Sequence, residues 1–349
     1  MGKPKGGKQL FMVEAGLELW DHDSDERENI YKPLEEQGVM NKTAFFIIKL
    51  IIGVSILAAL LSFIGFGTIT ENLKAFDIRS LLFIIPVSLF IDAISGLSIK
   101  IMTAKIAPKS TIFGFFRYTL LTQALSITVP GRIGELSMIY FYKKEKIPLG
   151  KGTAIFLLDK GMNLGFLCIL GLIGLLPFVG TGDFLKILGL LAAGGIIVLF
   201  FLFSAKGRDF LKNRLLKKYS ANFQGFGNTL RSFFQTQKMA LALDFLLTVI
   251  RWMLSAFILQ RLFSSFGVWI PMVTILVTNS LVFLVSLVPL TVQGIGVRET
   301  AAVVLFGFQG VPTAVTASAY LSYLIIMTIY TVGLATVLAK GNFRPKIPH

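Results

Sequence analysis

The sequence predicts an all-α polytopic membrane protein with about six transmembrane helices and two opposed re-entrant broken-helix hairpins, arranged as an inverted repeat. Hydrophobic residues make up 54% of the 349 residues and charged residues 15%, whereas a soluble domain carries roughly 25% charged residues. Mean hydropathy is +0.74, and several apolar windows reach the ~20 residues that cross a bilayer. Two long apolar stretches are broken by proline, glycine, arginine and glutamate. Such breaks are tolerated where protein or a wet cavity covers them, which indicates a transporter-like site near the midplane.

The elements follow from the apolar windows in chain order. Six full spans are expected at 44–66, 80–99, 153–179, 184–204, 239–262 and 313–339, and the broken stretches lie at 112–142 and 268–311. A single membrane domain at 43–340 therefore comprises a first half at 43–204 and a second half at 239–340. A cytoplasmic linker at 205–238 holds eight Lys/Arg, one acid and interleaved aromatic residues, and this composition predicts amphipathic interfacial helices.

The termini and the basic loops predict the orientation. Residues 1–42 form a polar tail with six Lys/Arg and nine Asp/Glu, and residues 341–349 form a basic tail. Lys/Arg-rich loops prefer the cytoplasmic side of the cell membrane, which places both termini there. Each broken stretch must then leave the membrane on the side that it entered, the first from the cytoplasm and the second from outside. The basic loops indicate anionic lipid head groups as partners and not nucleic acid.

An internal alignment supports the inverted repeat. When Glu135 is aligned with Glu299, Pro148 matches Pro312, and both prolines lie thirteen residues after the glutamates. The two regions also share hydropathy and a broken-helix context. Repeats of this kind, inverted in the membrane, are common among transporters, where the site lies at the repeat interface.

In the first break, Pro130 and Gly131 prevent a regular helix. Arg132 and the freed amides would suit a phosphate. Glu135, which follows Gly134, would pair with Arg132, bind a proton or face an amine. The competing interpretation is that Arg132 and Glu135 only neutralise each other to hold the hairpin.

The second break and the helix after the first break add further candidates. Gly294 and Gly296 permit close backbone approach, and Gln293, Arg298 and Glu299 supply polar groups; a packed turn with an Arg–Glu pair is the alternative. We predict a substrate-binding set from both breaks and this helix: Pro130, Gly131, Arg132, Gly134, Glu135, Asp159, Lys160, Asn163, Gln293, Gly294, Gly296, Arg298 and Glu299.

Intramembrane charges on regular helices are costly and should face the interior. Asp159 and Asn163 are four residues apart and share a helix face, and Lys160 points about 100° away from Asp159. The charges of this helix are expected either to contact substrate or to form a salt bridge to a hairpin. Asp244 and Arg251 are expected to form a packed pair within or between helices. Neither Asp92 nor Lys49 is expected in the site.

Several function classes are excluded by residue content. Cys168 is the single cysteine, and the histidines, His22 and His349, lie in the tails. An intramolecular disulfide, a thiolate metal cluster, a His-ligated zinc ion and a Ser-His triad are therefore not expected, and no catalytic residue or cofactor is predicted. No nucleotide-binding loop is present, so direct drive by ATP is not expected.

Three motifs resemble those of the lysylphosphatidylglycerol synthase transmembrane-region family of flippase-like integral membrane proteins. They are PGRIGE at 130–135, DKGMN at 159–163 and GIGVRE at 294–299 after Pro289. The second is similar to the family's Glu-Arg-x-x-Asp, with both acids and the arginine replaced, and Met138 stands where the family often has arginine. The resemblance implies a membrane domain associated with moving aminoacylated or other lipids. In the bifunctional synthases this domain is fused to a soluble transferase, and the chain is expected to be the stand-alone form.

The leading hypothesis is therefore a flippase or transporter of a phosphate-bearing lipid, aminoacylated or polyprenyl, with proton or ion coupling as an option. The alternatives are an intramembrane lipid-modifying enzyme and a non-transporting partner that presents lipid in cell-envelope assembly. The lipid, the direction of movement and the oligomeric state are not predicted.

Overall fold

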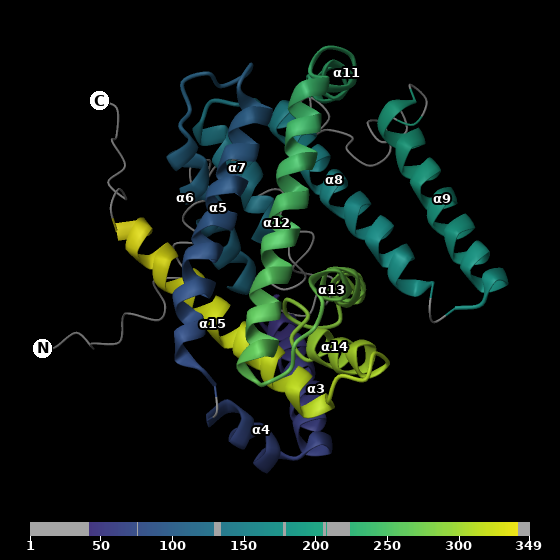
Figure 1. Ribbon diagram of the computed structural model, residues 1–349. Helices are drawn as coiled ribbons and strands as arrows, with labels where there is room; N and C mark the ends of the chain where they lie inside the picture. The colour runs from purple at the N-terminus through teal and green to yellow at the C-terminus, as the bar shows by residue number, and fades with distance from the viewer. Residues whose placement is uncertain are drawn as a thin grey trace, which may run out of the picture. The chain divides into compact units, whose positions relative to one another are not determined.

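The computed structural model describes residues 42–74, 76–128, 134–176, 179–204, 207 and 224–340. The chain divides into two compact units, residues 1–48 and 49–349. The described part of the first unit is the start of one helix. All regular elements in the described ranges are helical, as predicted (Figure 1). Residues 1–41 of the predicted tail at 1–42, residues 205–206 and 208–223 of the predicted linker at 205–238, and the predicted tail at 341–349 lie outside these ranges.

The helices follow the predicted order. The first part contains α3 (Lys42–Ile64), α4 (Phe66–Lys74), the short η1 (Ile78–Ser80), α5 (Leu81–Thr103), α6 (Ile112–Thr128), α7 (Ser137–Lys144), α8 (Leu149–Leu175) and α9 (Thr181–Phe203). The second part contains α11 (Phe226–Thr236), α12 (Lys238–Ser265), α13 (Met272–Ser286), α14 (Val297–Gly307) and α15 (Thr313–Lys340). Both predicted breaks fall where a helix stops and a shorter one begins.

Five described helices are long and apolar enough to cross a membrane. These are Phe46–Ile64, Ile78–Thr103, Leu149–Leu175, Lys238–Ser265 and Thr313–Ala339. The chain is therefore a multi-pass membrane protein. The predicted span at 184–204 forms α9, which is not among these five, so its crossing and the re-entrant path of the hairpins stay predictions.

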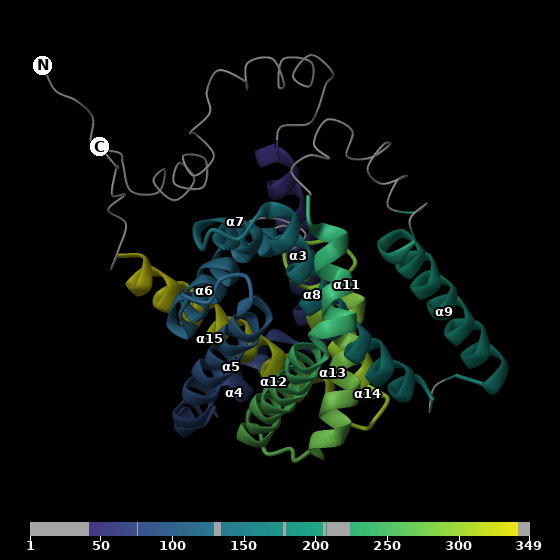
Figure 2. The ribbon, with the colours of Figure 1, turned by 90° about the horizontal axis from the view of Figure 1, so that it is seen from above.

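Helix α5 shows why these helices pack with their polar sides inward. Ser88, Asp92, Ser95 and Ser98 recur every three or four residues and are all buried, whereas Leu82 is 73% exposed. Helices α5 and α12 contact each other along their length, and α8 packs against α11 and α13 (Figure 2). Since lipid already solvates the apolar faces, the polar stripes define the interior.

Each break is closed by a glycine that lies against a serine eight residues earlier. A Cβ atom on Gly134 would lie 2.5 Å from the Ser126 Cα atom, and one on Gly294 would lie 3.0 Å from the Ser286 Cβ atom. In the second break a Cβ atom on Gly296 would also lie 2.4 Å from the Gly53 carbonyl oxygen of α3. The glycines therefore let the chain turn back against protein backbone.

The turns that precede α8 and α15 occupy equivalent positions in the predicted register of the repeat. Lys146 and Gly310, two residues before Pro148 and Pro312, both have positive φ, at 59° and 79°. The next amide bonds back five residues in each case, from Ile147 to Tyr142 at 3.0 Å and from Val311 to Phe306 at 3.1 Å. The same helix-terminating motif therefore recurs 164 residues apart.

Candidate functional site

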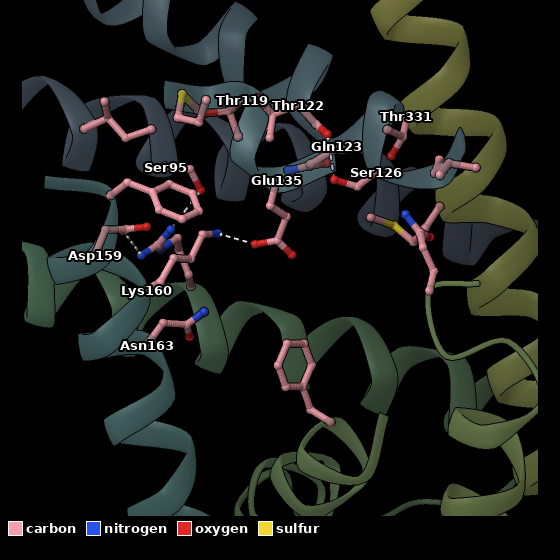
Figure 3. Close-up of a pocket in the computed structure, with 18 of the residues that line it drawn as sticks. Ser95, Thr119, Thr122, Gln123, Ser126, Glu135, Asp159, Lys160, Asn163 and Thr331 are labelled. Atoms are coloured by element: carbon pink, nitrogen blue, oxygen red, sulfur yellow. Dashed lines mark hydrogen bonds and ion pairs between the residues drawn. The ribbon is translucent and has the colours of Figure 1, made fainter. Parts of the chain in front are cut away.

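A polar cavity of about 370 Å³ lies where the two repeats meet. Residues of α5, α6, α8, α12 and α15 line it together with residues of both breaks. Its polar lining residues include Ser95, Thr119, Thr122, Gln123, Ser126, Glu135, Asp159, Lys160, Asn163, Arg251, Gln293, Arg298, Tyr323, Thr328 and Thr331 (Figure 3). A wet, charged pocket inside a bundle with an apolar exterior is the arrangement expected of a membrane functional site.

Helix α6 contributes a hydroxyl-rich face. Thr119, Thr122, Gln123 and Ser126 recur at helical spacing on the side that lines the cavity. The hydroxyl groups of Thr119 and Ser126 donate to carbonyl oxygens four residues earlier, at 2.9 and 2.8 Å. These bonds satisfy the hydroxyl donors within the helix, so the oxygen lone pairs remain available to accept.

An ion pair connects the first break to α8. Lys160 Nζ lies 2.8 Å from Glu135 Oε2, and the two side chains are 40% and 26% exposed. They point toward each other in Figure 3. This contact is the salt bridge to a hairpin that was the alternative interpretation of the α8 charges, yet both partners also line the cavity. Glu135 therefore interacts with Lys160, whereas the suggested partner Arg132 lies outside the described residues.

Arg251 is a cavity residue that the sequence did not identify. Its guanidinium lies 3.5 Å from Asp159 Oδ1 and donates to Ser95 and Thr248 at 3.3 and 2.7 Å. The expected packed pair of Arg251 with Asp244 is therefore replaced by a pair with Asp159 of α8. Asp244 instead accepts a hydrogen bond from Ser98 of α5. Although Asp244 and Arg251 are two turns apart on one helix, each reaches a closer partner on a neighbouring helix.

Arg298 brings a second guanidinium into the cavity at the start of α14. Its Cζ atom lies 4.8 Å from the ring centre of Tyr323 and 5.7 Å from that of Tyr320. Tyr320 is fixed by a 2.9 Å hydrogen bond to Asn279. Arg298 Nε is buried and has no hydrogen-bond partner among the described residues. The aromatic rings hold the cation by cation–π attraction, and Arg251 Nε in the same cavity is likewise buried without a partner among the described residues.

Glu299, a predicted substrate-binding residue, lies in the first turn of α14 and does not line the cavity. It is 2% exposed and its Oε2 accepts from the Gly296 amide at 2.7 Å. The carboxylate thus satisfies a free amide at the N-terminus of α14. Its negative charge also interacts favourably with the positive end of the helix dipole. Of the expected Arg–Glu pair in this turn, the arginine lines the cavity and the glutamate holds the turn.

The predicted set divides into three groups. Glu135, Asp159, Lys160, Asn163, Gln293 and Arg298 line the cavity. Gly134, Gly294, Gly296 and Glu299 form the turns without lining it, because their close neighbours are protein atoms. Pro130, Gly131 and Arg132 lie outside the described residues.

Many of the cavity residues missed by sequence reasoning are small and polar, and these lie on helices with a clear pattern. The serine stripe of α5 and the Thr/Gln/Ser stripe of α6 carried a detectable signal at three-to-four-residue spacing. Asn163 Oδ1 accepts from Trp252 Nε1 at 2.7 Å, a contact across helices that no local pattern predicts. Among the described residues, no three His, Cys, Asp or Glu side chains cluster as metal ligands.

Comparison with known proteins gives one match. The family model described as "Lysylphosphatidylglycerol synthase TM region" matches residues 46–335, which include both repeats and every residue of the cavity. No curated protein and no solved structure matches the chain.

Proposed function

The chain belongs to the lysylphosphatidylglycerol synthase transmembrane-region family, and we propose that it moves a phosphate-bearing lipid between the leaflets of the cell membrane. The observation that carries this proposal is the charged cavity enclosed by apolar helices, with a buried guanidinium donor at Arg298. The cavity takes the polar head group while the hydrocarbon chains stay in lipid. Both termini are then cytoplasmic, as the basic loops predict.

Arg298 supports a phosphate as the recognised group. Guanidinium groups bind phosphate oxygens through fixed, charge-assisted hydrogen bonds. The Nε donor of Arg298 is already desolvated and without a partner among the described residues, which is costly unless a ligand satisfies it. A phosphate at this position would accept that bond, and the hydroxyl groups of α6 would contact the remaining polar atoms.

The Glu135–Lys160 pair supports a head group that contains an amine as well. The pair is partly exposed to the cavity, where such an interaction is weak and exchangeable. An aminoacylated head group would offer an ammonium to Glu135 and a phosphate to Lys160 or Arg298. A polyprenyl phosphate would use the cations alone.

An apolar groove beside α14 supports a place for the hydrocarbon chain. This groove, of about 390 Å³, is lined by Ile56, Val285, Val297, Thr300, Ala301, Val304 and Leu305. Val297 of the groove precedes Arg298 of the cavity in the sequence, and both lie at the start of α14. A lipid needs a polar site for its head group and an apolar site nearby for its hydrocarbon chain.

The test is leaflet exchange in proteoliposomes. Labelled phosphatidylglycerol, an aminoacylated phosphatidylglycerol and a polyprenyl phosphate are compared in the wild type, Arg298→Ala and Arg261→Ala. Arg261 is a matched control because it also lies over aromatic rings, those of Phe83 and Phe257, but is outside the cavity. We expect head-group-selective exchange that only Arg298→Ala abolishes.

Two results would contradict the proposal. One is the absence of exchange for every lipid by folded protein. The other is chemical conversion of a lipid by the purified protein in detergent, where transport has no compartments, because this would favour an intramembrane enzyme.

A further inference from the structure

Asp92 occupies an unusual position for a carboxylate. It lies near the middle of the candidate membrane helix Ile78–Thr103 and is 3% exposed. An ionised carboxylate inside a membrane helix is energetically costly. Sequence reasoning gave Asp92 no role, because a lone acid on a membrane helix shows no partner by spacing.

Both carboxylate oxygens of Asp92 accept hydrogen bonds from neutral side chains. Gln123 Nε2 of α6 donates to Oδ1 at 2.8 Å, and the Tyr330 hydroxyl of α15 donates to Oδ2 at 2.8 Å. The carboxylates that line the cavity are held differently, because Glu135 pairs with Lys160 and Asp159 pairs with Arg251. A cation directly on a carboxylate favours its charged form, whereas neutral donors do so less.

The two donors let Asp92 change protonation without losing a hydrogen bond. An amide NH₂ group can only donate, so Oδ1 must remain an acceptor from Gln123 in either state. A tyrosine hydroxyl can both donate and accept, so the Tyr330 hydroxyl can rotate and accept from a proton on Oδ2. Asp92 and Tyr330 can therefore hold one more proton with the same heavy-atom positions.

The two hydrogen-bond partners of Asp92 connect it to the cavity. Gln123 lines the cavity itself, and Tyr330 is adjacent to the lining residue Thr331. The titratable and charged groups facing α5 here come from three neighbouring elements: Arg251 and Asp244 of α12, Tyr330 of α15, and Asp159 of α8 through Arg251. Asp244 is also buried and accepts from neutral Ser98, but neither residue lines the cavity.

We propose that Asp92 is a proton-binding site that couples lipid movement to a proton gradient. Protonation adds one proton to Oδ2, and release returns it toward the cavity that Gln123 lines. The two states differ in the charge next to the cavity and in the direction of the hydrogen bond at Tyr330, and this difference is what couples proton binding to the head group. The coupling rests on the proposed function, whereas the proton site stands on the Asp92 contacts alone.

The experiment has one readout for the proton site and one for the coupling. Infrared difference spectra of the protein in lipid, taken across a pH titration, report the C=O stretch of protonated carboxyl groups. Wild type is compared with Asp92→Asn and with Asp183→Asn, a control whose exposed carboxylate pairs with Lys186. We expect a band that Asp92→Asn removes and Asp183→Asn retains.

Asparagine at position 92 copies the protonated acid, because its amide oxygen accepts from Gln123 and its NH₂ group donates to Tyr330. We therefore expect Asp92→Asn to exchange lipid at the same rate with and without a pH gradient, and to lose the proton uptake that a dye inside the vesicles records. Tyr330→Phe serves as a second variant, in which the band should shift in frequency.

The outcomes separate the two proposals. A spectrum unchanged by Asp92→Asn and Tyr330→Phe would overturn the proton site. Gradient-driven exchange that persists in Asp92→Asn would overturn the coupling. In both cases wild-type exchange keeps the proposed function. If the wild type exchanges no lipid, the proposed function and the coupling fail, and the infrared band alone decides whether Asp92 binds a proton.

Discussion

The turn that leads from α7 into α8 and the turn that leads from α14 into α15 have the same backbone hydrogen bonds, yet the helices after them line the cavity with different chemistry. At positions 164 residues apart, α8 presents Asp159, Lys160 and Asn163 where α15 presents Tyr323, Leu324 and Met327. All six residues line the same cavity. At these matched positions α8 therefore supplies charged and polar groups, whereas α15 supplies aromatic and apolar ones, among them Tyr323 against Arg298.

The glutamates of the two breaks differ in the same way. Glu135 contacts Lys160 in the cavity, whereas Glu299 accepts from the Gly296 amide in its own turn. Backbone turns in a membrane must satisfy their own polar groups, so their geometry is retained between repeats. Side chains that line the cavity are not needed to satisfy backbone groups, and the two repeats differ at these positions. Four predictions test this division, from the largest expected effect to the smallest.

The two breaks should tolerate no side chain at their glycines. Gly296→Ala places a Cβ atom against the Gly53 carbonyl oxygen at a φ of +81°, and Gly134→Ala places one against Ser126. We expect each change to lower the free energy of unfolding by about 2–4 kcal/mol, measured by thermal unfolding in detergent. Gly161→Ala is the control, because no atom lies within 4 Å of its Cβ position. Equal stability of all three variants would contradict the close approach.

The cation of the second repeat should dominate transport. Arg298→Ala removes a charge-assisted hydrogen bond worth about 1.5–3 kcal/mol, so we expect exchange of the phosphate-bearing lipid to fall roughly 10- to 100-fold. Arg298→Lys keeps the positive charge but not the planar set of guanidinium donors. Its exchange rate should therefore lie between those of the wild type and Arg298→Ala. The rates are measured in proteoliposomes beside Arg261→Ala, and a loss as large in that control would show a general effect of removing arginine.

Asn163→Met copies the second repeat into the first. It removes the acceptor of the Trp252 indole N–H, and we expect a loss of about 1 kcal/mol in the free energy of unfolding. Asn163→Asp keeps an acceptor oxygen and should retain the bond, which the indole N–H signal in NMR would report. An unchanged indole signal in Asn163→Met would show that this contact does not hold α8 to α12.

Lys160→Leu copies Leu324 and should change selectivity more than stability. The pair with Glu135 is partly exposed, so its loss should alter the free energy of unfolding by less than about 1 kcal/mol. Without the cation the cavity becomes more negative near Glu135, and exchange of an amine-bearing lipid should rise relative to phosphatidylglycerol. Glu135→Gln combined with Lys160→Leu should cancel that preference, and a preference that remains would exclude the glutamate as its origin.

The sequence by itself determined the membrane class, the helix order, the positions of both breaks and the register of the repeat. These features depend on local properties: apolar windows, proline and glycine in the chain, and the equal spacing of Pro148 and Pro312 after their glutamates. It also identified six residues that line the cavity, because intramembrane polar groups must face the interior.

Only the tertiary structure decided which partner each charge has and which polar groups the cavity gathers. Arg251 reaches Ser95 across 156 residues and Tyr330 reaches Asp92 across 238, and such contacts follow from helix packing and not from spacing along one helix. The same packing turned Glu299 and the glycines from site candidates into parts of the turns. A charge in a membrane helix predicts that a partner exists, but the neighbouring helices determine which residue that partner is.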